Sequence, residues 1–245
     1  MTDFPARPPD FWAIARALFV LLGLSFWAQV LFHTGYTAYA NRPEPRALFY
    51  CALMPLLLLI LLALQNRQRQ RLGLGWAELG FRRPRRSLLQ LLWQLPLAYG
   101  LLLLLFHGLR LVVDAPLLPQ SRPLPPWWLF AVSIIFLVPL AEEIVFRGLL
   151  FCYLQPRYRR RGVLGWSSAL FALGHLGSGA LLLQPYFFLM GWLLGWLRLH
   201  HRNLWAAVAL HCFINAGGNP NPPADMSKIH WIMPNHHFNS SKRSL

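Results

Sequence analysis

The sequence predicts an all-α protein, a polytopic bundle of about seven transmembrane helices. Of its 245 residues, 56% are hydrophobic and only 13% are charged, whereas a soluble domain usually has about a quarter of its residues charged. The hydrophobic residues gather in long runs rather than at the period of two or 3.6 that is typical of a half-buried strand or helix. Such runs, with few charges inside them, indicate helices that cross a bilayer.

The apolar runs follow one another along the chain with short polar or basic segments between them. In order they cover residues 11–32, 47–64, 88–106, 127–155, 163–176, 181–199 and 204–216. A Pro-rich connection, residues 116–126, precedes the fourth run. Because these runs use up most of the chain, we expect one transmembrane domain over residues 1–217. We expect a polar, disordered tail over residues 218–245.

The basic residues predict the orientation in the membrane. The chain has 23 Lys and Arg against 8 Asp and Glu, a net charge of +15. The loops after the second, fourth and sixth runs carry seven, four and two basic residues, with Arg198 at the end of the sixth run counted in the last, against two, two and none in the other loops. The positive-inside rule then places the N-terminus in the cytosol. The bias toward Arg over Lys suggests a bacterial genome, so we expect an integral protein of the bacterial inner (plasma) membrane.

The same charges suggest partners. Arginine clusters at the ends of apolar runs are placed to contact anionic lipids. A nucleic-acid binder would carry its basic residues on a soluble face with polar or aromatic readers beside them. We therefore expect lipids at the Arg-rich loops and no nucleic acid.

Polar side chains lie deep within three of the apolar runs. They are Glu142, Glu143, Arg147, His175, His211 and Asn215. An ionisable residue within a span costs at least ~2.5 kcal/mol, so it indicates a functional site. The alternative is a hydrogen-bond network that only joins helices. Glu142, His175 and His211 lie roughly 20, 18 and 12 Å from the predicted cytosolic ends of their runs, so three helices can bring them to one cavity.

The spacing of the two glutamates assigns them different roles. Glu143 and Arg147 are four residues apart, so they share a helix face and can form an ion pair. Such a pair suits a structural role. Glu142 points about 100° away from its neighbour. Without a cation on its own helix, Glu142 is the candidate general base.

The histidines and the asparagine complete the predicted site. His211 and Asn215 are also four residues apart, and side by side they can donate hydrogen bonds to one developing oxyanion. His175 is a second candidate for activating water beside Glu142. Ser167 and Ser168 precede His175, but small polar residues in spans usually serve helix packing.

These residues fall into three blocks: Glu142-Glu143-x-x-x-Arg147, Phe171-x-x-x-His175 and His211-x-x-x-Asn215. In these blocks, over residues 127–217, the chain resembles the CAAX-processing and bacteriocin-processing (CPBP) family, also called the Abi or type II CAAX prenyl endopeptidase family. The resemblance implies an intramembrane endopeptidase that cleaves a membrane-associated protein or peptide. It implies that Glu142 and His175 activate a water, that His211 and Asn215 form the oxyanion site, and that Glu143 and Arg147 form the structural pair.

The resemblance also bears on cofactors. The family was long described as metalloproteases, and a Glu/His/His set can bind zinc. Its eukaryotic and archaeal members now favour a metal-free glutamate mechanism, and this chain has no HExxH motif. We therefore expect a CAAX-type glutamic endopeptidase with no cofactor.

Two other functions fit the same residues. One is a catalytically inactive family member acting as a scaffold or an immunity factor. The other is a proton-coupled transporter that uses the same buried carboxylate, although the chain lacks the internal repeat on which many transporters are built. The substrate stays open among prenylated CAAX proteins, bacteriocin leaders and C-terminal sorting tails.

Overall fold

A computed structural model describes residues 9–41, 45–112, 132–176 and 181–217, and every regular element in these ranges is a helix. The all-α class is therefore confirmed for this part of the chain. The predicted connection at 116–126 and the predicted tail at 218–245 lie outside the described residues.

Wherever the structure describes them, the predicted apolar runs coincide with helix. The long helices are α1 (Phe11–Asn41), α2 (Pro45–Arg71), α4 (Leu91–Val112, after the 3-10 turn η1, Leu88–Gln90), α8 (Arg160–Gly174), α9 (Gln184–His201, after the 3-10 turn η5, Leu181–Leu183) and α10 (Leu204–Gly217). The fourth run forms four consecutive helical segments, η2 (Val132–Leu137), α6 (Val138–Glu143), η3 (Ile144–Leu149) and α7 (Leu150–Leu154). Of the described stretches, only Leu88–Leu109 is long and apolar enough to cross a membrane, and Phe11–Leu24 and Leu204–Gly217 are shorter apolar helices. Seven spans thus stay a prediction.

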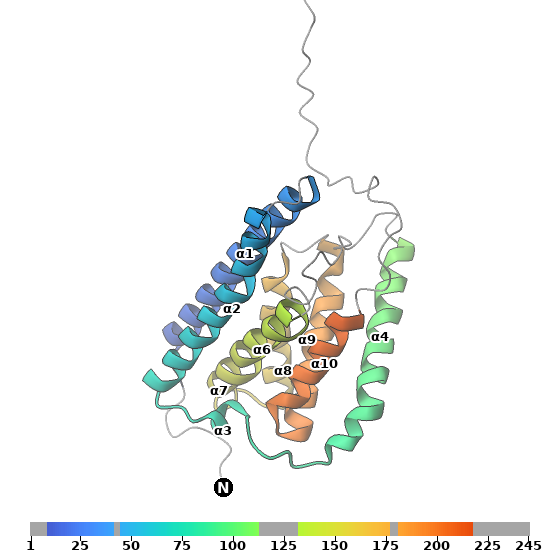
Figure 1. Cartoon of the computed structure of the whole chain (residues 1–245). Coiled ribbons are helices and arrows are strands. Elements are labelled where there is room, and N and C mark those ends of the chain that lie inside the picture. Colours follow the sequence, from blue (N-terminus) through green and yellow to red (C-terminus); the bar gives the residue numbers. More distant parts are fainter. Residues whose placement is uncertain (1–8, 42–44, 113–131, 177–180, 218–245) are drawn as a thin grey trace, which may run out of the picture.

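The helices pack side by side around the segmented fourth run. Figure 1 shows α1 and α2 together on one side of the bundle and α4 on the other, with α6, α8, α9 and α10 between them. Leu92, Leu97 and Leu104 of α4 face outward and are exposed. An outer face of this kind is normal for a helix that contacts lipid tails, where burial of apolar side chains inside the protein brings no gain over burial in lipid.

The fourth run is not a uniform α-helix. Both η2 and η3 are π-helical, and the short α6 between them carries Glu142 and Glu143. Single π turns inside helices occur frequently at functional sites, because the extra residue changes the direction of the side chains that follow. The sequence showed Pro139 in this run but predicted no π turn.

A short segment of the basic loop packs on the turn between α9 and α10, which the sequence did not predict. The segment begins with α3 (Trp76–Leu79) and continues to Arg85. Gly80 has a φ of 104°, and its carbonyl accepts a hydrogen bond from the Leu204 amide at 2.8 Å. The Arg85 amide donates to the carbonyl of His201 at 2.9 Å. Glycine is needed at position 80, because a Cβ there would lie in the guanidinium group of Arg198 as well as in the left-handed region.

Candidate active site

The centre of the site is a buried ion pair. Arg147 Nη1 lies 2.8 Å from Glu143 Oε1, and both side chains are 0% exposed. Arg147 Nη2 donates a second hydrogen bond to the carbonyl of Gly191 on α9 at 2.9 Å. A Cβ at Gly191 would lie 3.0 Å from Ser168 Cα, so glycine allows α9 to approach this close to α8. The structure therefore contains the pair that the four-residue spacing predicted.

His211 joins the two glutamates. Its Nδ1 lies 2.9 Å from Glu143 Oε1, and its Nε2 lies 3.8 Å from Glu142 Oε2. Because Glu143 Oε1 already accepts a hydrogen bond from Arg147 Nη1, we assign His211 Nδ1 as the donor in this contact. Nε2 is then the nitrogen that faces Glu142. From the sequence, Arg147 was the only interaction partner predicted for Glu143. The contact with His211 joins residues 68 positions apart, and no local pattern signals it.

Glu142 has the environment expected of a reactive carboxylate. Its side chain is 14% exposed, so it lies at the edge of the buried cluster rather than inside it. Its Oε2 is buried and has no hydrogen-bond partner within the described part of the chain. A carboxylate that is partly exposed at the edge of the cluster can take a proton from a bound water.

His175 is fixed by the last turn of its helix. It follows α8 directly, and its Nδ1 lies 2.8 Å from the carbonyl of Phe171. A carbonyl only accepts, so Nδ1 is the donor and Nε2 keeps a lone pair. The imidazole packs between two phenyl rings, with centroids 4.5 Å from Phe171 and 4.4 Å from Phe187. The tautomer leaves Nε2 able to accept a proton.

Phe171 connects the otherwise separate parts of the site. Its fully buried ring lies 5.9 Å from the ring of His211, and the guanidinium of Arg147 lies over it at 4.5 Å from the centroid. Its carbonyl holds His175. The sequence placed Phe171 in a motif with His175 but assigned it no role, because a buried ring alone is usually only core.

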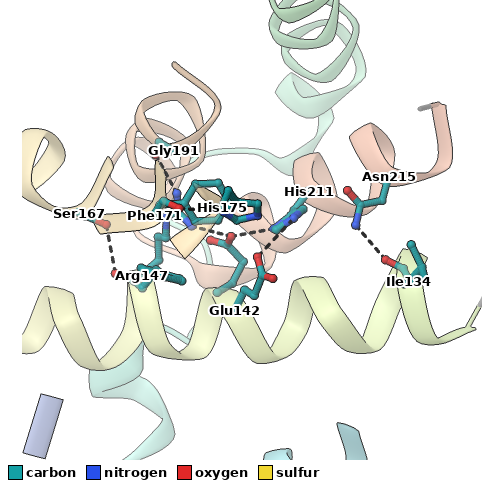
Figure 2. Close-up of polar contacts among 11 residues, drawn as sticks. Ile134, Glu142, Arg147, Ser167, Phe171, His175, Gly191, His211 and Asn215 are labelled. Carbon is teal, nitrogen blue, oxygen red and sulfur yellow. Dashed lines mark hydrogen bonds and ion pairs between the residues drawn. The ribbon is translucent and has the colours of Figure 1, made fainter. Parts of the chain in front are cut away.

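Asn215 points away from the carboxylates, as Figure 2 shows, and its Nδ2 donates to the carbonyl of Ile134 at 2.8 Å. Ile134 lies in η2, and in a π-helix a carbonyl accepts from the residue five positions ahead. Here that residue is Pro139, which has no N–H. Asn215 therefore provides a donor that the proline cannot. Its predicted part in an oxyanion site stays a prediction.

Gln65 is a further polar contact that sequence reasoning missed. It lies on α2, is 3% exposed, and its Nε2 donates to the carbonyl of Ala141 at 3.1 Å. Ala141 directly precedes Glu142, so this bond fixes the backbone of α6 next to the reactive carboxylate. Gln65 stands near the end of the second apolar run, where a glutamine is unremarkable, so only the structure reveals its partner.

The remaining polar residues near the site serve packing. Ser167 Oγ donates to the carbonyl of Phe146 at 3.3 Å, and Ser168 Oγ donates to the carbonyl of Leu164 at 2.6 Å. The Ser167 bond joins α8 to η3, as the sequence predicted, whereas the Ser168 bond lies within α8. Across the described ranges, no group of three or more His, Cys, Asp and Glu side chains is arranged to hold a metal ion. Metal independence itself stays a prediction.

Comparison with known proteins decides the family. A family model described as type II CAAX prenyl endopeptidase Rce1-like matches residues 124–217, the segment that carries all three motif blocks. This segment belongs to the Rce1-like family. The Rce1-like segment covers less than half of the chain, and it comprises the fourth run and helices α8 to α10. No curated protein and no solved structure matches the chain. At family level, the match supports a membrane protease of the CAAX kind for this segment.

Proposed function

We propose that this chain is an intramembrane endopeptidase that hydrolyses a peptide bond of a membrane-associated protein or peptide, using a water activated by Glu142 and His175 without a metal. The observation that supports this most is the position of Glu142. It is a partly exposed carboxylate with an unpartnered oxygen, next to a buried His211 that a second carboxylate orients. A network that served packing alone would satisfy that oxygen.

The proposed reaction begins with the water. Glu142 takes its proton, and His175 accepts a hydrogen bond from the same water at Nε2, so the hydroxide adds to the substrate carbonyl. The proton on Glu142 then passes to the leaving amine as the carbon–nitrogen bond breaks. Glu142 and Glu143 contribute two negative charges. Arg147 and a doubly protonated His211 contribute two positive charges, so in this mechanism the cluster is neutral overall.

His211 is the proposed oxyanion donor. Nδ1 donates to Glu143, and in the doubly protonated form Nε2 donates to the developing oxyanion. Glu143 stabilises the positive charge on the ring, a role additional to its pairing with Arg147. Asn215 would contribute through its second N–H, because the first donates to Ile134.

We further propose seven spans with the N-terminus in the cytosol of a bacterial inner membrane. The split of basic residues between alternate loops supports this orientation. Arg83 and Arg159 are both exposed and lie in two of the Arg-rich loops. Cysteines introduced there should react with a membrane-impermeant reagent only after the cells are opened. Labelling of both cysteines in intact cells would show the opposite orientation in the membrane.

Terminal-peptide mass spectrometry tests the function. Cells with the native chain, without it, and with Glu142→Gln should be compared for new protein termini. New termini present only with the native chain would support the endopeptidase. If the native chain produces no new termini, an inactive scaffold or a transporter fits better. Proton-coupled uptake of a solute by cells with the native chain, but not by cells with Glu142→Gln, would favour the transporter.

A further inference from the structure

A basic groove lies between α1 and α2, and none of its lining residues belongs to the Glu142 cluster. Its volume is about 350 Å³. Its walls come from the beginning of α1 and the end of α2, which are adjacent because the two helices form an antiparallel hairpin. Gln68 Nε2 donates to the carbonyl of Ala13 at 2.6 Å and ties the two helices together at this position.

The mouth of the groove carries three positive charges. Arg16, Arg67 and Arg71 line it, all three are exposed, and no Asp or Glu is among the lining residues. Within the described part of the chain, none of the three forms an ion pair. Three guanidinium groups along one groove, with no carboxylate among the lining residues, provide a site for an anion, and their planar donors suit phosphate oxygens.

The polarity of the groove changes along its length. On α2, Leu64 lies seven residues before Arg71, roughly 10 Å deeper in the hairpin. Leu64 is a large exposed hydrophobic residue, and it faces Ala17 and Val20 of α1 across the groove. A soluble anion would gain nothing from this apolar wall. A molecule with an anionic head and a hydrocarbon tail would bury both ends favourably.

Gln65 links the inner wall of the groove to the reactive helix. It is among the lining residues, its side chain is nearly fully buried, and its Nε2 donates to the carbonyl of Ala141. A molecule in the groove therefore lies against a residue that holds the backbone beside Glu142.

We propose that this groove binds one anionic phospholipid, with the phosphate on Arg16, Arg67 and Arg71 and the first acyl carbons along Leu64 and Val20. The site goes beyond the proposed endopeptidase activity and does not depend on it. Because Gln65 also holds the backbone beside Glu142, the bound lipid contacts the residue that positions the reactive helix.

The test is lipid binding to the full chain, purified in a neutral detergent and followed by native mass spectrometry. Phosphatidylglycerol should bind one molecule per chain, and phosphatidylcholine should bind far more weakly. The triple variant Arg16→Gln, Arg67→Gln, Arg71→Gln should weaken binding about 100-fold, at about 1 kcal/mol per basic residue. A matched control, Arg83→Gln, Arg159→Gln, Arg161→Gln, removes the same charge from exposed positions outside the groove and should bind normally.

Three outcomes would overturn the proposal. An equal loss of lipid binding in the control variant would mean that the lipid is attracted by the overall surface charge and not by this groove. Competition by inorganic phosphate at the concentration of the lipid would mean a site for free phosphate. No one-to-one binding to the native chain would mean that the groove is empty of lipid.

If the triple variant does not fold, Arg16→Gln and Arg71→Gln are tested singly, each expected to weaken binding about 5-fold.

Discussion

Two polar networks hold the Rce1-like segment together, and they are built in opposite ways. At the centre of the bundle, Glu143, Arg147 and His211 bind one another through charged or chargeable side chains. At the turn between α9 and α10, side chains bind backbone. Asn203 donates to the carbonyl of Arg82 and accepts from the Trp205 amide at 2.7 Å, which caps α10.

The turn also keeps its histidine neutral. His201 lies beyond the apolar run 181–199 and contacts Gln94 Oε1 at 2.7 Å. Burial lowers the pKa of His201 below its ordinary 6.5, so the ring carries no charge at neutral pH. Removal of one partner at the turn loses a neutral bond, whereas removal of one at the centre leaves a buried charge unpaired. The turn is thus suited to stability, and the centre to chemistry.

The largest effect is expected from Glu142→Gln. The variant should fold and insert normally, because Glu142 is not needed to balance Arg147, but cleavage should fall by about 10³-fold or more as the proton acceptor is lost. Rates would be measured on a substrate found by the terminal-peptide comparison. Glu78→Gln, which removes a carboxylate from α3 outside the site, is the control. Equal cleavage by both variants would contradict the assignment of Glu142 as the general base.

Glu143→Gln should act first on stability. It leaves Arg147 unpaired in the buried centre, which should cost about 3 kcal/mol or more in the free energy of unfolding. Thermal unfolding in detergent measures this. Adding Arg147→Met should restore much of the stability, while cleavage recovers only in part because His211 has lost the carboxylate that orients it. A stable but inactive Glu143→Gln would contradict the structural role of the pair.

Asn215→Ala separates two roles of one side chain. If the second N–H of Asn215 reaches the oxyanion, as proposed, cleavage should fall by about 10²-fold. Loss of the bond to Ile134 should also lower the free energy of unfolding by about 1 kcal/mol. Both quantities are measured on the same preparation. A loss of stability with an unchanged rate would leave Asn215 as an anchor for η2 only.

Asn203→Ala should affect stability alone. It removes the cap of α10 and the bond to the loop after α3, for a loss of about 1 to 2 kcal/mol. Cleavage per folded molecule should not change, since the turn holds no reacting group. Thermal unfolding and the rate at a temperature well below the transition test this. A large fall in rate at full folding would mean that the turn positions the site.

The smallest effect is expected from metal removal. Strong chelators should leave cleavage unchanged, because the charge of the two glutamates is balanced by Arg147 and His211 in the proposed mechanism. Elemental analysis of the purified chain accompanies the assay. Stoichiometric zinc that is lost and restored together with activity would contradict the proposal and make Glu142, His175 and His211 the candidate ligands.

The sequence by itself determined the helical class, the positions of the helices and the Glu143–Arg147 pair. Run length and composition predict apolar helices, and a spacing of four residues predicts a shared helix face, because both depend only on local geometry. The motif blocks in the fourth, fifth and seventh runs also predicted the family to which the Rce1-like segment belongs.

Only the tertiary structure decided how the groups meet. Glu143 accepts from His211 as well as Arg147, Phe171 lies against both, and Gln65 on α2 reaches the backbone beside Glu142. Asn215 turns to Ile134 because η2 is π-helical and Pro139 lacks a donor. Each of these contacts depends on the register and rotation of one helix against another, and the packing of the whole bundle sets those quantities rather than any local run of residues.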